Sequence, residues 1–439
     1  MSKSKHTLLA LMWAAAASLP ALAQTNGSNS SYSRFGLGTS SDQAQGFNRS
    51  MGGVAQGLRN GQYANRQNPA SYSAIDSLSF IFDVGMGLQF GRFTQGGSTA
   101  NARNTSLEYV NAGFRVAKGL GMNFGFAPFT RIGYNFTSAP GTPIGSSNTS
   151  GQSITSQTTY YGNGGLHQMY LGAGWNPIAD LSIGVNIHYL WGSYSHSLSQ
   201  TFYEGGTSSS NYNKQNAIWE SDINTYKIDL GAQYPVRISK RDLLTAGATV
   251  GLGHSIGSSV SMTRYTTQGD TIEAERRNAF DLPYTFSAGL AWQRDNKLTV
   301  AADYTIERWE GCKIPVYSSP TNDIQARTDQ YLNRHRVNLG AEYTENPMGR
   351  KYGQRIRYRI GASYATPNVK VNGLDGPKEY GVTAGVGLPL THAGKSVLNV
   401  GLEWKKRAPS TTSHITENYL MLHLGITFNE RWFMKWKFN

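Results

Sequence analysis

The sequence predicts an all-β protein: a transmembrane antiparallel β-barrel of about 14 strands with an N-terminal plug segment. Three observations predict this fold. The chain begins like an exported protein. Its apolar residues then alternate with polar ones over most of its length. The connections between the alternating stretches are short and long in turn, as in bacterial outer-membrane barrels.

The first 23 residues have the composition of a secretory signal peptide. Two lysines precede the apolar run 7–19, and Ala21-Leu22-Ala23 follows as a cleavage site between small residues. The apolar run is too short to cross a bilayer. We therefore expect residues 1–23 to be removed, the mature chain to begin at Gln24, and the protein to reach the bacterial outer membrane.

Composition narrows the class of the exported part. No later stretch approaches eighteen consecutive apolar residues, which excludes a helical membrane protein. A net charge of +13 is typical of proteins that bind nucleic acid, but an exported protein does not encounter nucleic acid as a partner. We expect contacts with outer-membrane lipid and lipopolysaccharide, and with other outer-membrane proteins or lipoproteins. Cys312 is the single cysteine, so we expect no internal disulfide, and we predict neither a metal nor a cofactor.

Strict alternation begins near residue 77. The even positions from Leu78 to Phe90 are apolar, and the odd ones are polar or glycine apart from Ile81. A period of two indicates a strand with two different faces, and we expect the even face to contact lipid. The barrel is predicted over residues 77–439. Its strands are expected near 78–92, 105–117, 121–137, 167–176, 180–202, 219–236, 243–265, 281–293, 298–309, 330–344, 354–365, 378–390, 396–407 and 417–428.

The connections give an independent test. Short ones such as Lys118–Leu120 alternate with the long polar stretches 138–166, 203–218 and 310–329. We expect the short turns in the periplasm and the long loops outside, with Cys312 in an outer loop open to a membrane-impermeant reagent. A soluble β-sandwich also has alternating strands, but its connections need not alternate in length.

The second face of the strands is rich in glycine and arginine. Glycine weakens a strand unless backbone must approach closely, as a barrel with an interior plug requires. The glycines are Gly113, Gly125, Gly184, Gly231, Gly247, Gly289, Gly340, Gly361, Gly385 and Gly425. A basic cluster of the lumen is predicted from Arg334, Arg336, Arg355, Arg357 and Arg359. These arginines are interpreted as solvated or paired with acidic residues, with a ligand site as the alternative.

Residues 24–76 lack the alternation but carry apolar anchors between glycines. Met51-Gly52-Gly53, continuing as Val54-Ala55, is followed by Asn68-Pro69-Ala70 just before the first strand. This order resembles the FadL-type (OMPP1/FadL/TodX-like) family of outer-membrane channels for hydrophobic compounds. The resemblance implies that residues 24–76 form a hatch that plugs a fourteen-stranded barrel.

The third predicted strand extends the resemblance. Residues 124–134 look like the family's third strand, where interrupted pairing opens the barrel wall sideways. Pro128 cannot donate a ladder hydrogen bond, so within a strand it marks an edge, a bulge or a kink. The resemblance implies a lateral gate at Phe126, Pro128 and Phe129; the alternative is a bulge near one rim without a gate.

The resemblance implies a passive channel for hydrophobic or amphipathic small molecules. The alternative is a non-transporting barrel subunit that scaffolds an outer-membrane protein assembly or secretion complex; the polar lumen, the basic charge and the aromatic tail 429–439 favour it. That tail either extends the last strand or lies at the periplasmic interface. An enzyme is not expected: His188, His254 and His335 lie in strands, but no Ser–His–carboxylate set can be recognised.

Overall fold

A computed structural model describes residues 29–138, 141, 145–146, 151–178, 180–208, 212–318, 323–390, 395–411 and 414–431. The expected signal peptide, residues 24–28 and the tail from residue 432 lie outside the described residues. None of the helices in the described part has the length or apolar composition needed to cross a bilayer.

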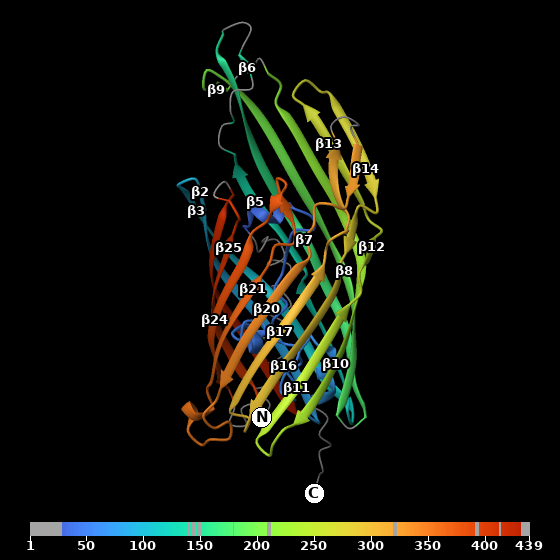
Figure 1. Ribbon diagram of the computed structural model, residues 1–439, viewed down its shortest axis with the longest axis vertical. Coiled ribbons are helices and arrows are strands. Elements are labelled where there is room, and N and C mark those ends of the chain that lie inside the picture. Colours follow the sequence, from blue (N-terminus) through green and yellow to red (C-terminus); the bar gives the residue numbers. More distant parts are fainter. Residues whose placement is uncertain are drawn as a thin grey trace, which may run out of the picture.

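Within the described residues, fourteen antiparallel strands close a barrel when β4 and β5 are counted as one interrupted strand (Figure 1). Closure is made between the first and the last strand, where Phe82 pairs with Phe428. The prediction of an all-β barrel of about 14 strands is confirmed. Its strands are β2 Ser79–Gln95, β3 Ser98–Ala117, β4 Leu120–Pro128, β5 Thr130–Thr137, β7 Ser153–Ile178, β8 Leu181–Glu204, β10 Gln215–Arg237, β11 Asp242–Gly251, β16 Tyr284–Arg294, β17 Leu298–Arg308, β20 Arg334–Tyr343, β21 Arg357–Ala365, β24 Lys378–Pro389, β25 Val397–Ala408 and β26 Thr416–Arg431.

The two faces of β2 carry the residues that the sequence predicts for them. Met86, Leu88 and Phe90 are exposed on the outer face, where lipid lies, and the odd positions face the lumen. The exception, Ile81, also faces inward and is 0% exposed, because it packs against Tyr72 and Ile75 of the plug segment. The apolar residue on the polar face therefore has a partner inside the barrel.

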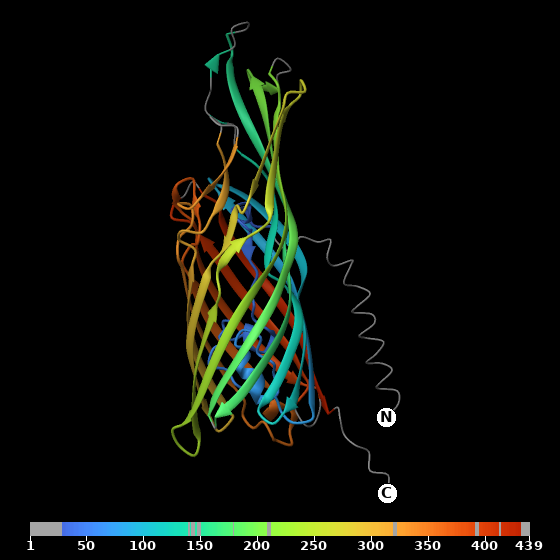
Figure 2. The same ribbon diagram turned by 90° about the vertical axis from the view of Figure 1, so that its right-hand side faces the viewer.

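Three strands continue far beyond the barrel at the end with the long connections. β7, β8 and β10 have 26, 24 and 23 residues, and with β13 Ser259–Thr266 and β14 Thr271–Arg277 they form a projecting sheet, here called the blade (Figure 2). The predicted loop 138–166 is therefore wrong in part, since β7 already begins at Ser153. Both faces of this stretch are polar, so the alternation that marks a lipid-facing strand disappears above the membrane.

The other predicted loops also contain strands. In the predicted loop 203–218, β8 ends at Glu204, β9 Thr207–Ser208 follows, and β10 begins at Gln215. The loop 310–329 contains the antiparallel pair of β18 Ile314–Ser318 and β19 Asp323–Arg327. The remaining small elements are η1 Ser31–Arg34, β1 Thr39–Ser40, α2 Gly46–Arg49, η2 Pro69–Ala74, β6 Gly145–Ser146, β12 His254–Ile256, β15 Phe280–Leu282, η3 Tyr352–Arg355, β22 Lys370–Val371 and β23 Leu374–Asp375.

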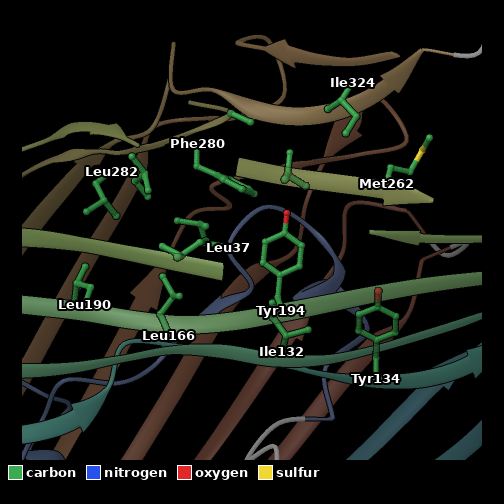
Figure 3. Packing of buried hydrophobic residues seen from close by; sticks show 14 residues of the cluster. Leu37, Ile132, Tyr134, Leu166, Leu190, Tyr194, Met262, Phe280, Leu282 and Ile324 are labelled. Atoms are coloured by element: carbon green, nitrogen blue, oxygen red, sulfur yellow. The ribbon is translucent and has the colours of Figure 1, made fainter. Parts of the chain in front are cut away.

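A buried apolar cluster joins the base of the blade to the mouth of the barrel (Figure 3). Leu166 and Leu190 of the blade strands, Phe280 and the plug residue Leu37 belong to it. A second cluster holds Cys312, which is only 9% exposed between Trp309 and Tyr331. The sequence predicts Cys312 in an outer loop, and the structure places it at the end with the long connections, but its expected accessibility is wrong because the connection folds back onto this cluster.

Candidate functional site

Residues 29–78, here called the hatch, lie inside the barrel (Figure 1). Their backbone follows the wall closely at positions where the wall carries glycine. The closeness is measured by the distance from a Cβ, built onto each wall glycine, to the nearest hatch atom. These distances are 3.1 Å for Gly425 of β26 to Gly46, 2.2 Å for Gly385 of β24 to Ser50, 2.0 Å for Gly361 of β21 to Gly52, 2.2 Å for Gly340 of β20 to Met51, 1.8 Å for Gly247 of β11 to Gln56, 2.4 Å for Gly184 of β8 to Pro69 and 2.0 Å for Gly121 of β4 to Tyr72.

The order of these contacts defines a path. As the hatch runs from residue 46 to residue 72, these contacts pass from β26 to β24, then to the adjacent strands β20 and β21, and on to β11, β8 and β4. Residues 62–64 leave this path, since Gln62 contacts Arg357 of β21 and Ala64 lies against Gly113 of β3. The hatch thus makes a circuit of the lumen, opposite to the order of the strands. Any side chain larger than hydrogen at these glycines would push it off the wall. Eight of the ten glycines predicted on the inner face contact the hatch; Gly125 and Gly289 instead contact atoms of neighbouring wall strands.

The first hatch motif lies directly against the wall. Gly52 and Gly53 have φ of +68° and +78°, which favours glycine. The N–H of Gly52 donates to Thr383 Oγ1 at 2.9 Å, and a Cβ on Gly52 would lie 2.5 Å from the carbonyl oxygen of Leu339. Met51, 2% exposed, packs its side chain against the wall.

The second hatch motif forms the start of η2. Asn68 caps this helix by accepting from the Ala70 N–H at 3.2 Å, and Pro69 occupies the first helical position. The Asn68 amide also donates to Gln56 O at 2.9 Å, which links two turns of the hatch. Ala70 is completely buried.

Wall side chains satisfy the hatch backbone. Asp303 of β17 accepts the N–H groups of both Ala55 and Gln56, and Gln233 of β10 donates to Gln56 O at 2.8 Å. Asn186 of β8 donates to Arg66 O at 2.9 Å. An irregular segment can be buried in a barrel only when its polar backbone is paired in this way.

A network of buried charges ties the hatch to one side of the wall. Arg49 pairs with Glu108 of β3 at 2.8 Å and contacts His423 of β26 at 3.2 Å. His423 lies 3.0 Å from Glu403, and Lys405 lies 2.9 Å from the same carboxylate. Because the groups are buried, removal of one partner would cost about 3–5 kcal/mol by leaving a charge unpaired.

A second network fixes the beginning of the hatch. Glu417 of β26, fully buried, accepts from Ser30 Oγ at 2.8 Å and from the Ser31 N–H at 2.9 Å. Arg407 lies 3.3 Å from Glu417 and 2.8 Å from Glu379. The hatch is therefore held at its start as well as along its circuit.

The predicted basic cluster is divided into two groups with separate partners. Arg334 and Arg336 lie near the long-connection end of β20, whereas the other three lie at the short-turn end, in η3 and β21. Their partners include Glu379 for Arg334 at 2.6 Å, Glu307 for Arg336 at 4.0 Å, Asn399 and Glu342 for Arg359 at 2.6 and 2.7 Å, Gln62 for Arg357 at 2.7 Å and the ring of Tyr352 for Arg355 at 5.7 Å. The arrangement is that of wall-to-hatch and wall-to-wall pairing.

The interruption predicted at Pro128 is visible in the strand pairing. β4 ends at Pro128 and β5 begins at Thr130, and both pair with β7 on one side. On the other side β4 pairs with β3, but in the described residues β5 pairs with β1 of the hatch instead. The stretch of β3 from residue 98 to 107 pairs with β2 alone. Pairing between neighbouring wall strands is thus broken above Pro128.

Hatch groups occupy the break. The Ser41 N–H donates to Phe129 O at 2.9 Å, and the Gln43 side chain donates to Pro128 O at 3.2 Å. Arg131 reaches across to β3 and donates to Ser106 Oγ at 2.9 Å. Of the predicted gate residues, Pro128 and Phe129 lie at the break, whereas Phe126 packs with the His167 ring, 5.6 Å away between centroids.

The cavities around the hatch differ in size. One of about 60 Å³ lies between the start of the hatch and the outer connections, and one of about 50 Å³ lies beside Gly57 and Thr245. Each has room for a few water molecules. A third, here called the bowl, measures about 460 Å³ at the long-connection end, in the size range of ligand pockets. Tyr160, Trp219 and Tyr317 line the bowl, with Arg34 stacked on Tyr160 at 4.4 Å.

Several residues of this site were not singled out in the sequence. Asp303, Glu108 and His423 each lie on the inner face of a strand, where a polar residue between outward apolar ones looks ordinary. The three histidines considered for catalysis have different neighbours: His188 lies 2.9 Å from Asp229, His254 2.8 Å from Thr225 and His335 2.6 Å from Tyr304. In the described part of the chain, no three His, Cys, Asp or Glu side chains are placed to hold a metal ion.

Comparisons with solved structures match this architecture. The CymD monoaromatic hydrocarbon channel has a TM-score of 0.58 at 13% identity, over 88% of this chain and 97% of that one. The toluene transporter TbuX of Ralstonia pickettii has 0.58 at 14%, over 88% and 98%. A FadL homologue of Pseudomonas aeruginosa has 0.57 at 12%, over 90% and 99%. The FadL-type fold predicted from the sequence is therefore confirmed.

A family model described as BamG matches residues 2–439, almost the whole chain. No curated protein matches the sequence significantly.

Proposed function

The chain belongs to the BamG family, and we propose that it is a non-transporting barrel that serves as a subunit of an outer-membrane protein assembly or secretion complex. The observation that carries this proposal is the circuit of the hatch along the glycines of the wall. A substrate could pass through the lumen only if this circuit came apart.

The cost of such an opening supports the proposal. Lifting residues 55–56 from the wall would leave Asp303 and two backbone N–H groups without partners, and lifting Arg49 would break its pair with Glu108. Each buried group left unpaired costs about 1–3 kcal/mol, and an unpaired buried charge costs more. The hatch is therefore a fixed part of the packed barrel rather than a segment that opens and closes.

The blade suits contact with other proteins. It carries β-strands well beyond the barrel, where lipid no longer covers them (Figure 2). A channel needs a through-path, but a scaffold needs a rigid body and protein surface outside the bilayer. The barrel with its fixed hatch supplies the first, and the blade supplies the second.

The test is purification of the tagged full chain from its own outer membrane in mild detergent. We expect other outer-membrane proteins or lipoproteins to remain with it in fixed stoichiometry through size exclusion. A variant with a shortened blade, in which Asn-Gly joins Gln200 to its paired residue Gln215, should fold but lose partners that contact the blade tip. Recovery of the full chain alone, together with uptake of a hydrophobic compound by cells that carry it, would overturn the proposal.

A passive channel for hydrophobic or amphipathic small molecules is the second candidate. The break above Pro128 and the aromatic bowl favour it, because together they offer a ligand pocket and a weak place in the wall. Under this function, Pro128→Val would restore pairing and reduce uptake of a hydrophobic compound, while Arg131→Gln would increase it. Unchanged uptake in both variants would leave the scaffold as the supported function.

A further inference from the structure

The outer face of the wall carries a basic patch where the first and last strands meet. Strand register aligns four outward residues in one row, Trp404, Leu420, Phe90 and Arg103. The next row toward the blade end aligns Lys406, Asn418, Arg92 and Asn101. Trp404, Leu420 and Phe90 are 44%, 52% and 46% exposed, so the rows face away from the lumen.

The two rows lie at the upper limit of the apolar belt. Below them the outward residues of the same strands are apolar, for example Leu402, Leu422 and Leu88. Tyr380 continues the second row beside Lys406, and its ring lies 5.3 Å from that of Tyr364. Aromatic residues gather at the membrane–water interface. The cations therefore lie at the level of the lipid headgroups of the outer leaflet.

The carboxylates nearest the patch lie on the other side of the wall. Glu403, Glu417 and Glu108 are buried on the lumen side, where they pair with other groups, and the exposed Glu430 lies at the opposite end of β26. None of the eight outward positions carries a carboxylate, while three carry a cation. The outer face is thus locally electropositive although the strands themselves contain both signs.

The patch also has a shape. A shallow groove of about 350 Å³ runs over Phe90, Arg92, Arg103, Trp404 and Leu420. Arg103 lies over the Phe90 ring, 5.7 Å from its centroid. Lys406 and Arg92 lie two strands apart, about 10 Å by strand spacing, and Arg92 and Arg103 form a diagonal pair about 7–8 Å apart. The groove therefore has an apolar floor, and three cationic side chains lie around one of its ends.

We propose that this groove binds a phosphorylated glycolipid of the outer leaflet: acyl chains lie along Trp404, Leu420 and Phe90, and the phosphates contact Arg92, Arg103 and Lys406. Arginine forms two parallel hydrogen bonds to a phosphate, and apolar surface below the cations suits a lipid rather than a free ion. The site does not depend on the proposed function, since either a scaffold or a channel would be seated in lipid.

The experiment measures binding of diphosphorylated lipid A to the purified full chain in detergent by native mass spectrometry. One arginine near an anionic lipid surface contributes about 1 kcal/mol, so Arg92→Gln should weaken binding about fivefold and Arg92→Gln/Arg103→Gln about twenty-five-fold. The matched control is Arg308→Gln, an exposed arginine at the blade end of β17 on another part of the wall. It should leave binding unchanged.

Two further arms identify the source of the phosphate. Lipid A without phosphates should bind to the natural chain as weakly as diphosphorylated lipid A binds to the double variant. Millimolar inorganic phosphate should not displace diphosphorylated lipid A from the natural chain. Equal losses for Arg92→Gln and Arg308→Gln, displacement by inorganic phosphate, or equal binding of dephosphorylated lipid A would each overturn the proposal. Heat-modifiable migration checks folding; should the double variant not fold, Lys406→Gln replaces it, with the same fivefold loss expected.

Discussion

Replacing Gly247 by alanine should detach the hatch from the wall at one defined point. The added Cβ would lie 1.8 Å from Gln56 O, whereas ordinary contact begins at 3.4 Å, so that carbonyl must move by about 1.6 Å. The movement would break its hydrogen bonds with Gln233, at 2.8 Å, and Asn68, at 2.9 Å. The Gln56 carbonyl would be left unpaired, at a cost of about 1–3 kcal/mol, while the two amides keep their bonds to Ala232 O at 3.3 Å and Leu58 O at 3.2 Å.

Tryptic cleavage of the folded protein at Arg59, next to the displaced segment, is the assay. Since 1.4 kcal/mol corresponds to a factor of ten, a cost of about 2 kcal/mol raises the population of the detached hatch about thirtyfold, and cleavage should accelerate by that factor. Gly251→Ala is the matched control on the same strand and face, because its Cβ would meet the movable end of Asp229 at 2.7 Å. Equal cleavage rates for both variants would refute the contact between the hatch and the glycines.

Three other predictions test the membrane face, the outer loops and the lumen. Val84→Arg should destabilise the barrel by about 2–4 kcal/mol relative to Val84→Ala in a folding titration into lipid, because Val84 faces the bilayer; equal stability would place it elsewhere. Gly85 is no control, since its Cβ would lie 2.3 Å from the Tyr109 ring. Burial, with Asp281 nearby, raises the pKa of the Cys312 thiol to about 11, so the unreactive protonated form dominates below that pH. At pH 7.4 an impermeant maleimide should therefore leave the natural chain unlabelled, whereas it should label a Cys312→Ser chain that carries Glu310→Cys at an exposed position. Equal labelling of the two chains would contradict the burial of Cys312. Deleting residues 30–60 should leave an inserted, heat-resistant barrel that conducts ions in a planar bilayer while the intact chain conducts little; two equally silent forms would mean that outer connections or wall side chains also close the lumen.

The wall of the barrel could be predicted from the sequence because lipid imposes a local rule. Each outward residue from Phe80 to Phe90 contacts acyl chains, so each must be apolar whatever its neighbours do. The same rule explains the failure in β7, where the stretch from Ser153 to Tyr161 has water on its outer face and polar side chains on both. There the composition resembles a loop, and only the long ladder with β8 identifies the strand.

The candidate site was only partly accessible to the same reasoning. Gly52, Asn68 and Pro128 stand out because glycine and proline restrict the backbone in ways that a sequence reveals. Asp303 and Glu108 do not stand out, because the sequences of β17 and β3 do not indicate which hatch atom lies opposite each carboxylate. Their roles follow from partners 248 and 59 residues away along the chain.

The sequence by itself determined a barrel wall of about fourteen strands with an inner face rich in glycine and charge, since alternation and residue size are local properties. Only the tertiary structure decided that the hatch runs against the order of the strands, from Gly425 back to Gly121. It also decided that Ser41 and Gln43 occupy the break at Pro128. The physical reason is that a buried backbone must find hydrogen-bond partners somewhere, and the wall offers many; which ones it takes depends on the closed barrel as a whole.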